Sequence, residues 1–234
     1  MEDSSFARVV SVLFNPAQTF AAIRERPTWL VPFVLLIAVS LTGAFLVSQK
    51  VDWVEVAEET LAAQNRPMSE SEREQAIDAM EKFMPVSTLI GPLMAWPVFT
   101  LLTALVCLVG INALGGQLSY KQSFSTVVHS TMPQLLAGLL TIPVVLGRPS
   151  FTFFELQGGS FLKSNLGAFA TEETPGALRA LMGSIDLFTL WGVVLLSLGL
   201  AIVGRLSKGA SAAVAIGVWV LWTLILVGLA SLQG

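Results

Sequence analysis

Long uncharged apolar stretches, separated by polar connections, dominate the pattern of this 234-residue chain. A hydrocarbon core of about 30 Å is crossed by a helix of about 20 predominantly apolar residues. Five stretches fit such helices, and we assign spans to residues 29–49, 86–113, 124–147, 185–204 and 209–232. The pattern therefore predicts an all-α fold, a polytopic transmembrane helix bundle of five spans in a single domain over residues 1–234.

The segment before the first span, residues 1–28, has a periodicity of its own. Apolar residues recur at i, i+3, i+4, i+7 and i+8, at Phe6, Val9, Val10, Leu13 and Phe14, the spacing of a stripe on a helix. Asn15 is a favourable N-cap and Pro16 is tolerated at the first helical position, so a second short helix is expected to about Arg24. Both helices are expected in the membrane interface, either packed under the bundle or forming a surface for a partner.

Residues 50–85 are the most polar part of the chain, with nine acidic and four basic residues. A helix is expected over residues 53–64 and a break at residues 65–67. Ser69, with Glu72 three residues later, forms the pattern of a capping box that opens a second helix. The pattern predicts an extracytoplasmic helical hairpin with a solvated acidic face, and a cation site is the less favoured alternative.

Residues 148–184 mix polar residues with five phenylalanines. Aromatic rings are favoured at the level of the lipid headgroups. We therefore expect an outer loop that lies on the bilayer surface or caps the bundle. A re-entrant segment is disfavoured, because lipid-exposed irregular backbone leaves polar groups unpaired.

Basic residues set the expected orientation, because short connections rich in Lys and Arg stay in the cytoplasm. The N-terminal segment and the second and fourth connections share one side, with Arg8, Arg24, Arg26, Lys121, Arg205 and Lys208. The other side holds seven basic residues in longer and more acidic loops. We therefore expect a cytoplasmic N-terminus and an outer C-terminus. The start Met-Glu-Asp lacks the basic residues of a cleavable leader, so the first span is expected to remain in the mature protein.

Composition agrees with a bilayer environment and narrows the chemistry. Charged residues make up 12% of the chain, against about a quarter in a soluble domain. The single cysteine, Cys107, and the single histidine, His129, cannot form a disulfide, a cysteine metal motif or a histidine pair within the chain. Catalytic and phosphate-loop motifs are absent from the sequence, and a net charge of −3 without a basic tract argues against nucleic acid. We expect no catalytic residue, cofactor or metal, and a protein that is not an enzyme.

Two features inside the spans are candidates for function. Asp186 opens the fourth span and is interpreted as a helix cap or a partner for a basic side chain, with a proton or cation site as the alternative. His129 is interpreted as a satisfied interfacial histidine. Gly209, Ala213 and Gly217 recur every four residues in the fifth span, the pattern of a helix-packing seam. A helix of the same chain is the default neighbour, and another chain is the alternative.

Three groups of residues carry a family resemblance. The first is Leu13-Phe14-Asn15-Pro16 with Thr19, Phe20 and Ile23, the second Gly115-Gly116 with Phe124 and Pro133, and the third Asp186-Leu187-Phe188 with Trp191, Gly199 and Leu206. In their order and spacing, over nearly the whole chain, they resemble the YIP (Ypt-interacting protein) membrane domain family in its small bacterial form. The resemblance implies a bacterial cytoplasmic (inner) membrane protein.

Eukaryotic members of that family are Golgi and endoplasmic-reticulum proteins that bind Rab-type GTPases and support vesicle traffic. The resemblance therefore implies a non-enzymatic membrane adaptor. This chain lacks their long hydrophilic N-terminal region and their Asp-Leu-Tyr-Gly-Pro signature, and these departures argue against a GTPase partner.

Two functions follow as hypotheses. The favoured one is an adaptor, assembly subunit or membrane organiser that acts through helix and interface contacts with lipids, other integral membrane proteins or itself. The alternative is a transporter or channel for a small solute or lipid that uses the second and third spans, bent by prolines. A water-filled cavity that reaches mid-bilayer and is lined by Asn112, Gln134 or Asp186 would favour it. The scarcity of intramembrane charges favours the first hypothesis.

Overall fold

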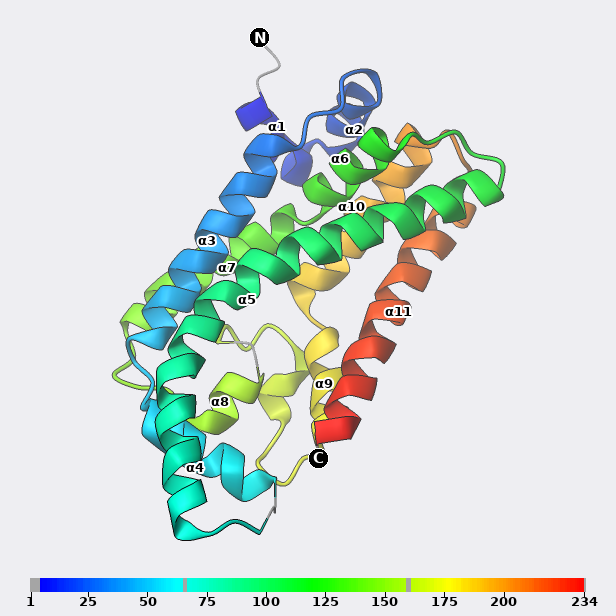
Figure 1. Ribbon diagram of the computed structural model, residues 1–234. Helices are drawn as coiled ribbons and strands as arrows, with labels where there is room; N and C mark the ends of the chain where they lie inside the picture. Colours follow the sequence, from blue (N-terminus) through cyan, green and yellow to red (C-terminus); the bar gives the residue numbers. More distant parts are fainter. Residues whose placement is uncertain (1–4, 65–66, 159–160, 234) are drawn as a thin grey trace. The chain divides into compact units, whose positions relative to one another are not determined.

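The computed structural model describes residues 5–64, 67–158 and 161–233, and within them the regular structure is helical apart from two isolated β-bridges (Figure 1). The predicted all-α class is confirmed. The elements are α1 (Ser5–Phe14), α2 (Pro16–Glu25), α3 (Leu30–Ser48), α4 (Trp53–Ala63), α5 (Glu70–Ala113), α6 (Tyr120–Ser130), α7 (Met132–Leu146), α8 (Phe153–Gly158), the 3-10 helix η1 (Leu166–Phe169), α9 (Gly176–Ser184), α10 (Leu187–Val203) and α11 (Lys208–Gln233).

The helices form two compact units. Unit 1 comprises Met1–Val39, Ala95–Ala137 and Leu187–Trp222, and unit 2 comprises Ser40–Met94, Gly138–Asp186 and Thr223–Gly234. Helices α3, α5, α7 and α11 contribute residues to both units. Each unit is described by itself below.

Four segments of the described chain are long and apolar enough to cross a membrane, namely Leu30–Ser48, Glu70–Ala113, Tyr120–Leu146 and Lys208–Leu232. The segment predicted as the fourth span, residues 185–204, forms α10. Its 17 residues rise about 26 Å, somewhat less than a hydrocarbon core of about 30 Å. A bundle of five spans therefore remains a proposal that depends on α10.

Helix α5 is longer than the pattern predicts. Its 44 residues continue through the expected boundary between a hairpin ending at residue 85 and a span beginning at residue 86. The capping box that opens it is present, because the Ser69 N–H donates to the Glu72 carboxylate at 2.8 Å and the Glu72 N–H donates to Ser69 Oγ at 3.4 Å. Pro85 removes one backbone donor without ending the helix, as prolines in membrane helices often do.

The segment predicted as the third span, residues 124–147, is divided into α6 and α7 at Thr131. Pro133, the second residue of α7, has no N–H to continue the hydrogen-bond ladder from α6 into α7. Thr131 Oγ1 donates instead to the Val128 carbonyl at 2.8 Å. The break is thus set by a proline near the start of α7.

In unit 1, α10 packs against α2 and α6, and α1 packs against α2 and α6. The buried residues of α10 follow a helical stripe of Phe188, Gly192, Leu195, Leu196, Gly199, Leu200 and Val203. Inside a bilayer, helix association depends on close van der Waals packing and on small residues. The contacts of α10 therefore hold the core of unit 1 together.

In unit 2, the segment expected to be an aromatic loop contains α8, η1 and α9. Phe151 is buried with Val47 and Val145, and its ring lies 4.8 Å from that of Phe161. The ring of Phe151 therefore fills the small core of this unit, and the position of the segment relative to the bilayer stays a prediction. Phe169, in contrast, is 77% exposed.

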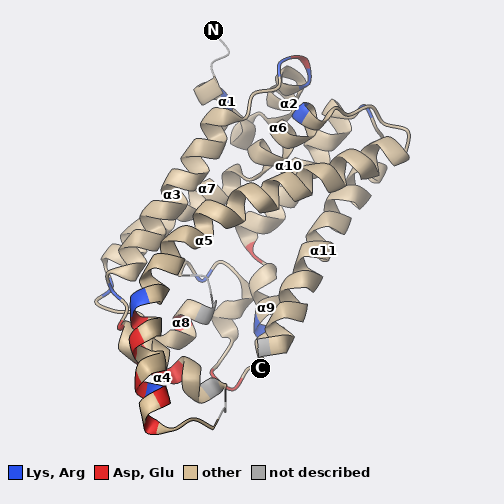
Figure 2. Ribbon diagram, in the orientation of Figure 1, with Lys and Arg blue, Asp and Glu red and all other residues tan. Residues whose placement is uncertain are grey.

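Most of the acidic residues of unit 2 lie at the start of α4, along α4 and on the first turns of α5 (Figure 2). Asp52 caps α4 by accepting the Val54 and Glu55 N–H groups, and Arg73 of α5 pairs with Glu58 of α4 at 3.7 Å. The predicted break at residues 65–67 lies partly outside the described residues. A solvated acidic face agrees with the exposure of these carboxylates.

The ionisation of Glu155 should make the local stability of unit 2 depend on pH. Partial desolvation works to raise its pKa, but hydrogen bonds from Arg148, at 2.5 Å, and from the Thr152 N–H, at 3.1 Å, hold the pKa below its ordinary value of 4.5. A depressed pKa contributes stability above the ordinary value, and this stability is lost as the pH falls through the folded pKa. We expect the protection of the α8 amides, relative to their intrinsic exchange rate at each pH, to fall as the pH drops below 4.5, and Glu155→Gln to abolish that response. An unchanged pH response in the variant would assign it to another group.

Candidate functional site

The first motif group joins α1 to α2. Asn15 stands at the N-cap of α2 but makes no side-chain capping bond, contrary to the expectation. Its backbone carbonyl accepts the Thr19 N–H at 3.1 Å and the Thr19 hydroxyl at 3.0 Å. Pro16 begins α2 as expected, and the Thr19 hydroxyl is 2.8 Å from that of Ser11 in α1. These bonds fix the angle between the two helices.

The first and third motif groups meet at Gly199 in the middle of unit 1. A Cβ atom at Gly199 would lie 2.8 Å from Phe20 Cε1 and 2.7 Å from Thr126 Cγ2. Phe20 and Thr126 are both fully buried. Because real Cβ atoms do not approach so closely, only glycine lets α10 pack on α2 and α6 at this point.

The second motif group meets the C-terminal end of α10 just after α5 ends. Gly115 has a φ of +89°, the left-handed region that favours glycine. A Cβ on Gly116 would lie 2.8 Å from the Gly204 carbonyl, and the Gln117 N–H donates to that same carbonyl at 2.8 Å. The connection after α5 is therefore held directly on the C-terminal end of α10.

The remaining motif residues pack in unit 1 or lie at the start of a helix. Pro133 is buried near the start of α7, and Gln134 beside it donates to the Phe188 carbonyl of α10 at 3.4 Å. Trp191 packs against the core of unit 1. Asp186, in unit 2, immediately precedes α10 and accepts a hydrogen bond from Ser164, which fits the boundary reading of this carboxylate.

The small-residue stripe on α11 does not pack within the described chain. Gly209, Ala213 and Gly217 are all exposed, and a Cβ at Gly209 or Gly217 would meet nothing within 4 Å. The default expectation of a seam with another helix of this chain is therefore not met. Contact with another chain stays a prediction.

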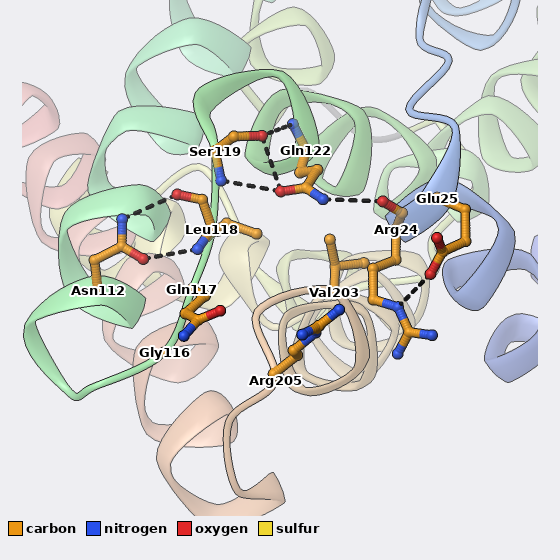
Figure 3. Close-up of a pocket in the computed structure, with 10 residues that line it drawn as sticks. All are labelled: Arg24, Glu25, Asn112, Gly116, Gln117, Leu118, Ser119, Gln122, Val203 and Arg205. Atoms are coloured by element: carbon orange, nitrogen blue, oxygen red, sulfur yellow. Dashed lines mark hydrogen bonds and ion pairs between the residues drawn. The ribbon is translucent and has the colours of Figure 1, made fainter.

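A polar pocket of about 560 Å³ opens in unit 1 where three connections converge (Figure 3). The lining comes from the end of α2, the α5–α6 connection and the end of α10, and comprises Arg24, Glu25, Asn112, Gly116, Gln117, Leu118, Ser119, Gln122, Val203 and Arg205. From the sequence alone, Arg24 and Arg205 serve only as markers of orientation. Their convergence has no sequence signal, because they are far apart in the chain.

Two buried polar residues also differ from expectation. Arg8 is only 4% exposed and donates to the Arg26 carbonyl and the Thr28 hydroxyl. His129 is fully buried, and its Nδ1 lies 2.8 Å from the Ser125 carbonyl, whereas its Nε2 has no hydrogen-bond partner in the described structure. The interpretation of a satisfied histidine is therefore only half right. In the described residues, no group of three or more His, Cys, Asp or Glu side chains is placed to hold a metal.

These features define a helical membrane protein whose N-terminal amphipathic helices are built into its core. The chain belongs to the Yip1 domain family, which it matches over residues 10–230. It is similar to Membrane protein YknW of Bacillus subtilis (strain 168), with 27% identity over 217 residues that cover 91% of this chain and 87% of YknW. No solved structure matches the chain. The family resemblance inferred from the three motif groups is confirmed.

Proposed function

We propose that this Yip1-domain protein acts without catalysis, through helix and interface contacts with membrane proteins or lipids, as an adaptor, assembly subunit or membrane organiser. The proposal includes five spans in a bacterial inner membrane, a cytoplasmic N-terminus and an outer C-terminus. The orientation is supported by the short basic connections on one side of the predicted topology.

The proposal rests mainly on the two faces of helix α1. One face is fixed in unit 1 through the buried residues Val9 and Val12. The other face exposes Phe6, Val10 and Phe14 at intervals of four residues, with Phe14 75% exposed. An apolar stripe on a helix that is held in place suits the acyl boundary of a bilayer or a neighbouring membrane protein. The two readings of the N-terminal helices, packing and docking, thus apply to opposite faces of α1.

The transport alternative receives less support from the residues it requires. The side chain of Asn112 is engaged by the backbone of Leu118, accepting its N–H at 2.8 Å and donating to its carbonyl at 3.0 Å. Gln134 donates to the Phe188 carbonyl. Both amides thus make hydrogen bonds to the backbone, which favours a role in holding the fold, although Asn112 also lines the polar pocket of unit 1.

Replacing Phe6, Val10 and Phe14 together with serine tests the proposal. The expected result is that wild-type protein purified in mild detergent repeatedly carries the same membrane partner, and that the triple variant loses it while remaining inserted. The exposed apolar contact is removed, and the buried face of α1 is untouched. Quantitative mass spectrometry of the purified material is the measurement.

Phe169→Ser is the matched control, because Phe169 is equally exposed but lies in unit 2. This variant should retain the partner. A strictly solitary wild-type protein that supports solute flux in liposomes would contradict the contact function and favour transport.

A further inference from the structure

The pocket of unit 1 has more positive charge than its own acidic residue neutralises. Its two basic residues are Arg24 and Arg205, and its one acidic residue is Glu25. Glu25 accepts a single bond from Arg24 Nε at 3.0 Å, which leaves the two terminal nitrogens of that guanidinium for another acceptor. Among the described residues, the exposed Arg205 side chain makes no hydrogen bond or ion pair. Five guanidinium N–H groups on one arginine form a rigid fork of donors.

The other polar side chains of the pocket hold its walls in place. Gln122 donates to the Arg24 carbonyl at 2.9 Å and accepts the Ser119 N–H at 3.0 Å, in a capping box that opens α6 (Figure 3). Asn112 is bonded at both ends of its amide to the backbone of Leu118. The two arginines therefore stand on a scaffold that is organised without a ligand.

Arg205 occupies a position where glycine is the preferred residue. The Leu206 N–H donates to the Ala201 carbonyl at 3.2 Å, the bond that closes a Schellman motif at the end of α10. Arg205 then takes the C′ position, with a φ of +54°. Left-handed backbone is unfavourable for a side chain, and strain of this kind concentrates at functional sites. The Arg205 side chain extends toward that of Arg24 across the pocket (Figure 3).

We propose that this pocket binds a phosphate group, with the Arg24 and Arg205 guanidiniums donating hydrogen bonds to its oxygens. Two planar forks from different elements match the several oxygens of a phosphate better than a single carboxylate. The volume lies in the range of small-ligand sites, about 300–1,000 Å³. Because the pocket lies at the ends of apolar helices, the phosphate of an anionic lipid headgroup is within reach, and a phosphorylated solute presents the same chemistry. This site goes beyond the contact function proposed above and does not depend on it.

Binding by purified full-length protein tests the site in two arms. One arm uses phosphatidylglycerol in phosphatidylcholine nanodiscs, read by native mass spectrometry of retained lipid. The other arm titrates glycerol 1-phosphate into delipidated protein in a neutral detergent. Retention of phosphatidylglycerol alone identifies a lipid headgroup, and saturable binding of glycerol 1-phosphate identifies a soluble phosphate. Either result supports the site. If neither phosphatidylglycerol nor glycerol 1-phosphate binds, the proposal is overturned.

The variants Arg205→Gly and Arg24→Gln should each weaken binding about tenfold to a hundredfold, the loss expected for a charge-assisted hydrogen bond. Arg205→Gly should keep or raise the melting temperature, because glycine relieves the left-handed backbone, so lost binding cannot be attributed to misfolding. Arg26→Gln is the matched control, since Arg26 is exposed directly after α2, two residues from Arg24, but does not line the pocket. Equal loss in Arg26→Gln and the pocket variants would mean general surface attraction and would overturn the proposal.

Discussion

Replacing Gly199 by leucine should lower the free energy of unfolding by about 3 kcal/mol, at the upper end of the usual cost of overpacking. The new side chain would collide with Phe20 Cε1 at 2.8 Å and Thr126 Cγ2 at 2.7 Å already at its Cβ. Both neighbours are fully buried in helices α2 and α6, so neither can move away without opening the core of unit 1. Unfolding in mixed micelles, followed by tryptophan fluorescence, is the measurement.

Gly43→Leu in α3 is the control for that experiment. A Cβ at Gly43 would meet nothing within 4 Å, so the same substitution should change stability by no more than about 0.5 kcal/mol. Gly199→Ala should fall between the two, because it adds the colliding Cβ without the rest of the side chain. Comparable losses at Gly43 and Gly199 would show that leucine acts through the helices themselves rather than through the crossing at Gly199.

The N-terminal helices illustrate what local pattern can predict. The periodicity of residues 6–14 and the Asn15-Pro16 pair place α1 and α2 correctly, because helix period and proline geometry are properties of the local chain. The pattern cannot divide the apolar residues between faces. Val9 is buried, whereas Phe6, Val10 and Phe14 are exposed. In a membrane protein, core and lipid-facing positions are both apolar, so hydropathy does not separate them.

Sequence pattern also cannot tell which glycines lie at close helix contacts. The regular stripe of Gly209, Ala213 and Gly217 is exposed, while the close approaches of unit 1 occur at Gly199 and Gly204. A small residue permits a close approach, but the neighbouring helix decides whether one occurs. The candidate pocket is non-local for the same reason, since its cations come from α2 and from the end of α10. Only the folded chain reveals that residues chosen as markers of orientation converge.

Replacing Arg8 by alanine should lower the free energy of unfolding by about 3 kcal/mol and release α1 from unit 1. Arg8 is a buried cation that donates to the Arg26 carbonyl at 2.7 Å and to the Thr28 hydroxyl at 3.1 Å. Alanine removes both donors and leaves a void among buried groups. Hydrogen exchange of residues 5–14 is the measurement, and protection there should fall by more than in α10.

Arg26→Ala provides the control, because it removes an exposed guanidinium but keeps the backbone carbonyl that Arg8 uses. Its α1 should exchange as slowly as in the wild type. Arg8→Lys should give an intermediate loss, because an ammonium keeps the charge but not the planar fork. Equal protection of α1 in Arg8→Ala and Arg26→Ala would mean that the apolar contacts of Val9 and Val12 alone fix the helix. If Arg8 does fix it, Arg8→Ala should also lose the membrane partner, because the exposed stripe of Phe6, Val10 and Phe14 is then no longer held in one orientation.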